Sequence, residues 1–156
     1  MSTPVLKNRL QSDLTDAIRA RDQVRSATLR LALTAVKSQE VAGSSARELS
    51  DDEVLAVLRT EVKKRREAAE AFAAAGRPDR AERERAEQEV LESYLPAQLT
   101  EDELTGLVAE AVAQAAASGQ TGTAAMGRVM GLVRARTGQR AEGGRVAAEV
   151  RRQLQG

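Results

Sequence analysis

Cysteine and histidine are both absent from this 156-residue chain, and its only aromatic side chains are Phe72 and Tyr94. Without cysteine the chain has no disulfide and no thiol nucleophile, and without histidine it has no imidazole for acid–base catalysis. The sulfur and imidazole ligands of protein zinc sites are excluded by the same absences. Two aromatic rings are also too few for a surface on which successive bases stack, which disfavours reading of single-stranded nucleic acid.

Long apolar segments are missing too. No stretch approaches the roughly 18 consecutive apolar residues of a membrane-spanning helix. The N-terminal stretch MSTPVLKNRLQSDL has no apolar core of the kind found in secretory signal peptides. We therefore expect a cytoplasmic protein with no membrane partner.

Motifs for catalysis are absent as well. The chain contains no P-loop, no GxGxxG motif and no cluster of metal-ligating residues. Ser44, Ser45 and Ser50 have no histidine to act as their base. The carboxylates stand beside Lys and Arg, as they do in surface ion pairs. We therefore expect no catalytic residue, no cofactor and no metal, and we lean toward a protein that is not an enzyme.

Charged residues make up 30% and apolar residues 42% of the chain, a composition typical of a folded globular protein. The formal net charge is only +1, but the charges are unevenly distributed. Residues 96–121 contain four acids and no base, whereas residues 122–156 contain seven arginines against two glutamates. This local excess of +5 favours attraction to a polyanion.

Apolar residues recur at helical spacing along the whole chain, and no segment alternates as a strand does. Thr3 and Pro4 predict the start of a first helix, and Asp22 is a candidate N-cap for a second. The apolar stripe predicted for the first helix comprises Leu6, Leu10, Leu14 and Ile18. The inner face predicted for the second comprises Leu29, Leu33 and Val36.

Two capping boxes predict further helix starts. The side chain of Ser50 is placed to accept from the amide of Glu53 while Glu53 reaches back to the Ser50 amide, and Thr100 with Glu103 repeats the pattern. Two more helices are predicted near residues 123–136 and 143–154.

Glycine and proline divide the chain. Gly76 predicts the end of the third helix, and Pro78 starts a fourth that ends before Pro96. We therefore predict an all-α protein, with a four-helix N-terminal domain over residues 1–95 and a small three-helix C-terminal domain over residues 96–156.

The third helix carries the basic run in EVKKRREAAEAF. On a helical wheel Arg59, Lys63 and Arg66 share one flank. Lys64 points away from them, and Arg65 falls near the apolar axis, so that its stem would cover the edge of the core while its head reaches water. We favour a solvated charged face. The alternative is that Arg59, Lys63 and Arg66 follow the phosphates of a nucleic acid.

The stretch AAMGRVMGLVRARTG is more distinctive. Glycine costs about 1 kcal/mol relative to alanine inside a helix, so Gly127 and Gly131 indicate the close approach of another backbone. We favour tight packing against another helix, and the alternative is a sugar–phosphate backbone. The predicted core stripe is Met126, Val129, Met130 and Val133, beside a stripe of small residues, Ala124, Gly127, Gly131 and Ala135. The candidate phosphate contacts that flank the glycines are Arg128, Arg134, Arg136 and Arg140.

Three segments, FAAAGRPD, EVLESYLPAQLTEDEL and MGRVMGLVRARTGQRAEGGRVAAEV, resemble the YqeY family in their order, over essentially the whole chain. That family (GatB/YqeY) is similar to the C-terminal tail of the B subunit of the glutamine-dependent Asp/Glu-tRNA amidotransferase, a carbon–nitrogen ligase. The resemblance implies an all-helical protein with four helices followed by three. In the amidotransferase the tail helps to hold the tRNA while the chemistry lies in other domains, so the resemblance implies no catalysis by this chain.

Two positions depart from the pattern of the family. The family often has an acidic residue where this chain has Ala125, which weakens any role for a carboxylate there. It often has Ala-Asp-Gly before the last helix, where this chain has Glu142 followed by Gly143 and Gly144. Glutamate caps a helix less well than aspartate, so we expect a less sharp start to the last helix.

Two hypotheses for function follow. The first is an accessory protein that binds structured RNA, tRNA above all, or the tRNA-charging machinery, through phosphate contacts from the C-terminal helices. The second is a protein–protein interaction module without RNA binding, in which Met126, Met130 and the small residues receive a partner helix. The sequence does not indicate an oligomeric state.

Overall fold

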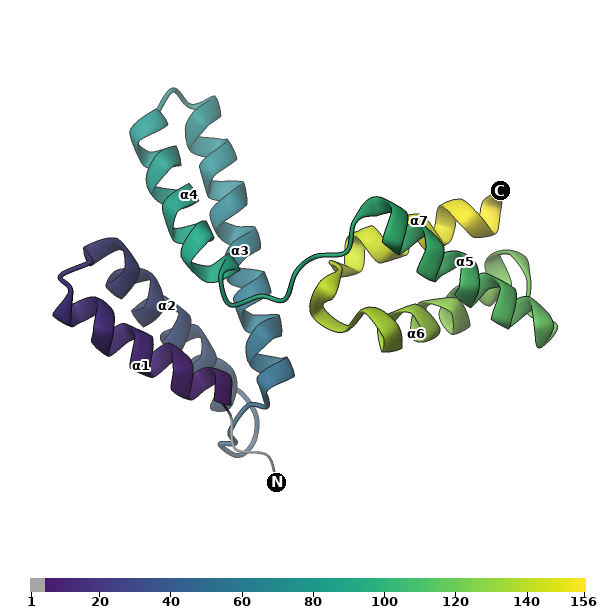
Figure 1. Cartoon of the computed structure of the whole chain (residues 1–156), viewed down its shortest axis with the longest axis horizontal. Helices are drawn as coiled ribbons and strands as arrows, with labels where there is room; N and C mark the ends of the chain where they lie inside the picture. Colours follow the sequence, from purple (N-terminus) through teal and green to yellow (C-terminus); the bar gives the residue numbers. More distant parts are fainter. Residues whose placement is uncertain (1–4) are drawn as a thin grey trace. The chain divides into compact units, whose positions relative to one another are not determined.

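The computed structural model of the chain describes residues 5–156, apart from the side chain of Gln139. The predicted cap at Thr3 and Pro4 lies outside the described residues. Over the described part the regular structure is entirely helical, which confirms the all-α prediction (Figure 1). Its elements are α1 (Val5–Arg19), α2 (Gln23–Glu40), α3 (Asp51–Ala74), α4 (Pro78–Glu92), α5 (Glu101–Ala117), η1 (Gly122–Ala125), α6 (Met126–Thr137), η2 (Gly138–Arg140) and α7 (Gly143–Gln155).

The chain divides into two compact units, Met1–Leu95 and Pro96–Gly156. In the first unit α1 packs beside α2, and α3 packs beside α4 (Figure 1). Its apolar core comprises Leu10, Ala17, Leu29, Ala32, Val36, Leu49, Val54, Leu58, Val62, Leu91 and Tyr94. The second unit packs α5, α6 and α7 against one another. Its core comprises Leu99, Leu104, Val108, Ala111, Ala115, Ala125, Val129, Val133, Ala141, Val146 and Val150.

Local signals place most helix ends. Both predicted capping boxes are confirmed, with the side chains of Ser50 and Thr100 accepting from the amides three residues later. Asp22 caps α2 by accepting from the amide of Arg25. Gly76 has a φ of 73°, the left-handed conformation that ends a helix and that glycine adopts without a steric penalty. These signals therefore act as predicted.

The apolar stripe of α1 differs from the prediction at its C-terminal end. Leu10 is fully buried, but Ile18 is 48% exposed and Ala17 takes the inward position. Each step of four residues overshoots one helical turn by about 40°. Over the steps from Leu6 to Ile18 this drift rotates the last member of the stripe away from the core.

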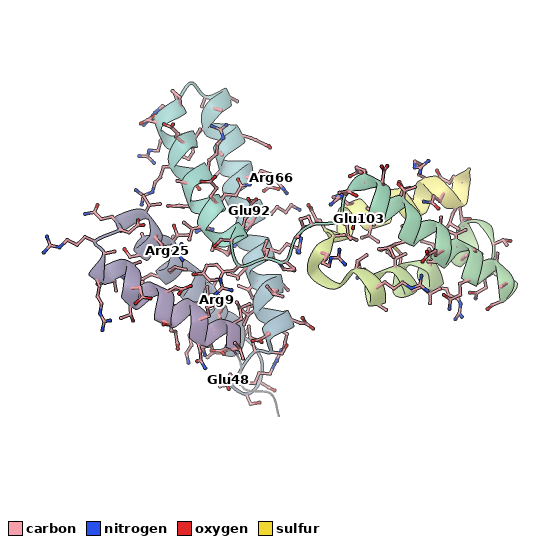
Figure 2. All side chains as sticks on the ribbon, in the orientation of Figure 1. Arg9, Arg25, Glu48, Arg66, Glu92 and Glu103 are labelled. Carbon is pink, nitrogen blue, oxygen red and sulfur yellow. The ribbon has the colours of Figure 1, made fainter. Side chains whose placement is uncertain are left out.

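Polar side chains join the helices of the first unit. The Tyr94 hydroxyl donates to Asp13 at 2.5 Å, and Arg25 donates to the same hydroxyl at 3.2 Å. Arg9 lies over the Tyr94 ring, with 4.8 Å between its guanidinium carbon and the ring centroid. Figure 2 shows Arg9 and Arg25 reaching this region from α1 and α2. The end of α4 is thereby held to both of these helices.

The sixth helix begins later than predicted. Residues Gly122–Ala125 form a 3-10 turn, and the α-helix proper starts at Met126. Ala125 has no side-chain oxygen to accept from first-turn amides, and the Met126 amide instead donates to the Thr123 carbonyl. The last helix starts at Gly143, where Glu142 makes no side-chain cap, as its residue type predicts.

Candidate nucleic-acid interface

The outer face of α6 consists largely of small residues. Val129, Val133 and Thr137 form the buried face of α6. Helical periodicity therefore places Gly127, Gly131 and Ala135 on the opposite side of the helix. Both glycines are exposed. A Cβ added to either glycine meets no other atom within 4 Å.

This exposure corrects the favoured interpretation of the glycines. Helix packing within the chain does not explain Gly127 or Gly131, because neither approaches a neighbouring helix in the structure. Both residues still lower the stability of α6 relative to alanine by about 1 kcal/mol each. Their position leaves the backbone of α6 open to a partner outside the chain.

The two methionines predicted to receive a partner helix pack instead against the core of their own unit. Met126 and Met130 are half-buried and pack against the core of the second unit, beside Val129 and Val133. Their membership of the core stripe is therefore confirmed. The same packing occupies the side chains that a partner helix would contact, which removes much of the surface that the protein-interaction hypothesis invoked.

Four of the seven arginines in this unit form salt bridges. Arg136 donates to Glu110 at 3.0 Å and to the Gln114 side chain at 3.0 Å, which ties α6 to α5. Arg140 lies 3.7 Å from Glu103, at the start of α5. Figure 2 labels Glu103 at that helix start. Two of the four predicted phosphate contacts are therefore already paired with carboxylates.

The last helix supplies the other two pairs. Arg145 donates to Glu101 at 2.9 Å and to the Leu99 carbonyl at 3.0 Å. Arg152 donates to Glu149 within α7, and this contact, followed by a bond from Gln153, lowers the pKa of Glu149 to about 2.

These salt bridges change the meaning of the charge excess at residues 122–156. Three of the carboxylates that pair with its arginines stand on α5, outside that segment, and tertiary packing brings them beside α6 and α7. The +5 excess read along the sequence is therefore largely neutralised in three dimensions. The cationic surface is smaller and more localised than the sequence predicts.

The remaining three arginines, Arg128, Arg134 and Arg151, have exposed side chains. Among the described residues none of them has a carboxylate within 4.0 Å. Arg128 and Arg134 were predicted as contacts, whereas Arg151 was not. Arg151 can be identified because it does not belong to the row of residues that faces α5. That row consists of Arg145, Glu149 and Gln153 at intervals of four, which leaves Arg151 on the other flank of α7.

Arg134 lies beside the first turn of α7. A Cβ added to Gly143 would stand 3.5 Å from its Nη2 atom. The carboxylate of Glu142 is also near, because a Cβ on Gly144 would lie 3.9 Å from Glu142 Oε1. That negative charge makes the helix N-terminus a poor anion site by itself, so the cationic character there comes from Arg134.

The basic run of α3 lies in the other unit and has a different environment. Lys63 and Arg66 are exposed, while Arg59 is half-buried. Arg66 lines a groove of about 570 Å³ between α3 and α4, together with Glu92 of α4 (Figure 2). The charged residues of the groove are Arg66, Arg85, Glu70, Glu82, Glu89 and Glu92. Carboxylates outnumber guanidiniums there, which disfavours a phosphate.

Arg65 lies deeper than the edge of the core. Only 11% of its side chain is exposed, and its Nε atom is buried. Its Nη1 donates to Glu61 at 2.7 Å, and its Nε lies 3.6 Å from Glu87 of α4. Glu61 stands one turn before Arg65 on the same helix, whereas the carboxylate of Glu87 draws the guanidinium into the contact between α3 and α4. The sequence of α3 alone cannot show this partner.

Other site types find no support in the described residues. Within that part of the chain, no group of three or more His, Cys, Asp or Glu side chains is placed to hold a metal ion. No described helix combines the length and apolarity needed to cross a bilayer. A cavity of about 510 Å³ lies between α2 and α3, where the charges at its edge are paired, Arg47 with Glu53 and Lys64 with Glu61.

The chain is similar to a known protein family and to a curated relative. The family model described as Yqey-like protein matches residues 7–154. An uncharacterized protein of Schizosaccharomyces pombe (strain 972 / ATCC 24843) is 33% identical over 94 residues, which is 60% of this chain and 74% of that relative.

Proposed function

We propose that this chain, which belongs to the YqeY family, is a non-catalytic accessory protein that binds tRNA through its C-terminal unit. The observation that carries the proposal is that some arginines of that unit are paired with carboxylates and others are not. Four are bound to carboxylates, while Arg128 and Arg134 of α6 are exposed and have none within salt-bridge distance among the described residues. The resemblance to the tail of the amidotransferase B subunit supports the choice of tRNA.

Unpaired arginines are the better phosphate ligands for an electrostatic reason. A guanidinium that already holds a carboxylate must share or break that contact before it binds a phosphate, and an approaching phosphate is repelled by the carboxylate. Among the described residues neither Arg128 nor Arg134 holds a carboxylate that a phosphate would have to displace. The fixed fork of donors on each arginine also matches phosphate oxygens in a bidentate arrangement.

The proposed surface consists of Arg128 and Arg134 with Gly127 and Gly131 between them, and with Arg151 on the neighbouring helix. Arg136 and Arg140 play a supporting part, since they hold α6 and the turn after it against α5.

The three predicted contacts of α3, Arg59, Lys63 and Arg66, are left out of the proposed surface. They stand in the other unit, and the groove that Arg66 lines has more carboxylates than guanidiniums.

A matched pair of double variants tests this assignment. Arg128→Ala with Arg134→Ala removes two unpaired cations, and Arg136→Ala with Arg140→Ala removes two paired ones, so both variants lose the same formal charge. We would measure binding of purified full-length protein to bulk tRNA by fluorescence anisotropy in 50 mM salt. We expect the first variant to lose affinity at least about tenfold, as two charge-assisted contacts imply, and the second to lose much less.

Equal losses in the two variants would contradict the assignment, because they would indicate attraction by total charge alone. Unchanged binding after removal of Arg128 and Arg134 would contradict it more directly. A pull-down after nuclease treatment addresses the protein-interaction hypothesis. A protein partner retained without RNA, combined with no tRNA binding in 50 mM salt, would favour that hypothesis over the proposal.

A further inference from the structure

The unpaired arginines of α6 point in different directions. Arg128 and Arg134 are six residues apart, which separates them by about 9 Å along the helix axis. They also stand on opposite flanks of the outer face, with Arg134 turned toward the first turn of α7. This span exceeds the axial spacing of about 3.4 Å between successive phosphates on one strand of a duplex, so the two guanidiniums cannot share neighbouring phosphates. Their position on opposite flanks of α6 lets the two contacts fall on separate strands.

We propose that the RNA is bound as an A-form double helix, with the outer face of α6 across its minor groove and with Arg128 and Arg134 on phosphates of opposite strands. This inference rests on the proposed function, and it names the structural class of RNA that the site takes. The recognised feature is the shape of the duplex and not its sequence.

Groove dimensions select this geometry. An α-helix with side chains is about 10–12 Å across, whereas the minor groove of B-form DNA is only about 6 Å wide. The A-form minor groove is wide and shallow, and the A-form major groove is too deep and narrow for side chains to read. A helix face bounded by two cations therefore fits across the minor groove of duplex RNA and not across that of duplex DNA.

The surface between the two arginines agrees with a shallow groove. Gly127 and Gly131 carry no side chain, and both are exposed with open space beyond the backbone. The two glycines themselves offer no side chain that could read base edges in the major groove of DNA. Without a side chain at these two positions, the backbone of α6 can closely approach the wide and shallow minor groove of RNA, which displays the 2′-hydroxyl groups.

A substitution that fills this surface provides the sharpest test. Gly131→Gln adds a side chain whose Cβ has no other atom within 4 Å, and Gly106→Gln is the matched control, because Gly106 is an exposed glycine inside α5 with equally open surroundings. Glutamine forms helices better than glycine, so both variants should melt at temperatures equal to or above that of the wild type. Loss of folding therefore cannot explain a loss of binding.

The binding partners in this test are tRNA, a 20-base-pair RNA duplex, the DNA duplex of the same sequence and one of the RNA strands alone, all measured by fluorescence anisotropy in 50 mM salt. We expect the RNA duplex to bind at least about tenfold more tightly than the DNA duplex and the single strand. We expect Gly131→Gln to lower the affinity for the RNA duplex at least about tenfold, because the added side chain keeps the phosphates away from α6. We expect the affinity of Gly106→Gln to stay within about twofold of the wild-type value.

Several results would overturn the inference. Equal binding of the DNA and RNA duplexes, tighter binding of the single strand, or wild-type affinity in Gly131→Gln would each do so. If tRNA still bound in those cases, the proposed function would stand without this mode of recognition. No binding of any RNA would overturn both.

Discussion

The Tyr94 hydroxyl lies 2.5 Å from a carboxylate oxygen of Asp13, across a sequence separation of 81 residues. Burial of the ring, followed by the hydrogen bond to Asp13, raises the pKa of Tyr94 to about 12. Because Tyr94 is the only tyrosine of the chain, its ionisation is visible without interference in the near-ultraviolet absorbance. This contact joins the last turn after α4 to α1 and thus closes the first unit.

The titration of Tyr94 provides a first prediction. The folded pKa is above the value of about 10 expected in the unfolded chain. The neutral hydroxyl therefore stabilises the fold fully below pH 10, and this contribution is lost as the pH rises through about 12. An absorbance titration should show little phenolate in the native protein at pH 10, where a urea-unfolded sample is half ionised. A native midpoint near 10 with helical circular dichroism retained would contradict this arrangement.

A second prediction concerns the buried Arg65. Arg65→Ala leaves Glu61 and Glu87 largely buried with one cation fewer between α3 and α4, and removal of one partner from such a cluster typically costs about 3–5 kcal/mol. Lys64 and Arg83 still contact these carboxylates, so we expect a loss near the lower end, about 3 kcal/mol. Urea unfolding followed by circular dichroism measures it.

Lys63→Ala is the control for Arg65→Ala. Lys63 is an exposed cation on the same helix, and its removal should change the free energy of unfolding by less than about 0.5 kcal/mol. Similar losses in the two variants would show that Arg65 behaves as an ordinary surface residue, against the buried position described above.

A third prediction compares two buried threonines. Thr28 donates its hydroxyl to the Val24 carbonyl at 2.7 Å, whereas the hydroxyl of Thr137 is buried with no hydrogen-bond partner among the described residues. Replacement by valine keeps the branched shape in both cases. We expect Thr28→Val to destabilise the protein by about 1 kcal/mol and Thr137→Val to be neutral or stabilising by about 1 kcal/mol. A clear loss of stability in Thr137→Val would mean that its hydroxyl has a partner after all.

A fourth prediction concerns acid. The side chain of Arg47, followed by the amide of Ser50, lowers the pKa of Glu53 to about 2. Because the unfolded value is about 4.3, this group stabilises the fold above pH 4.3 and loses its contribution as the pH falls toward 2. Glu53→Gln should therefore flatten the pH dependence of the unfolding free energy across that window.

Glu67→Gln is the matched control for this acid prediction, since Glu67 is an exposed glutamate on the same helix. We expect its pH dependence to follow that of the wild type. If both variants flattened the curve equally, the capping box and Arg47 would not be the source of the acid sensitivity.

Much of the fold can be predicted from the sequence because its signals are local. Apolar spacing, the caps at Asp22, Ser50 and Thr100, and the glycine at Gly76 each act within one or two turns, and the all-α class follows from them. Membership of the YqeY family was identified from segments along the chain, and the family model supports it.

The candidate site could be predicted only in part, since its properties depend on contacts distant in sequence. The wheel places Arg128 and Arg134 beside the glycines, but it cannot show that Glu110 and Glu103 of α5 bind Arg136 and Arg140. Nor can it show that Gly127 and Gly131 face open space, because that depends on which side of α6 its neighbours cover.

The salt dependence of tRNA binding tests the central claim most directly. With three unpaired arginines on phosphates, affinity should fall about 40-fold between 50 and 200 mM salt, using the duplex slope as a guide. The double variant Arg128→Ala with Arg134→Ala should retain only about a 3- to 4-fold dependence, as one remaining contact implies. A parallel salt dependence in wild type and variant, or no tRNA binding by the wild type even in 50 mM salt, would contradict the account.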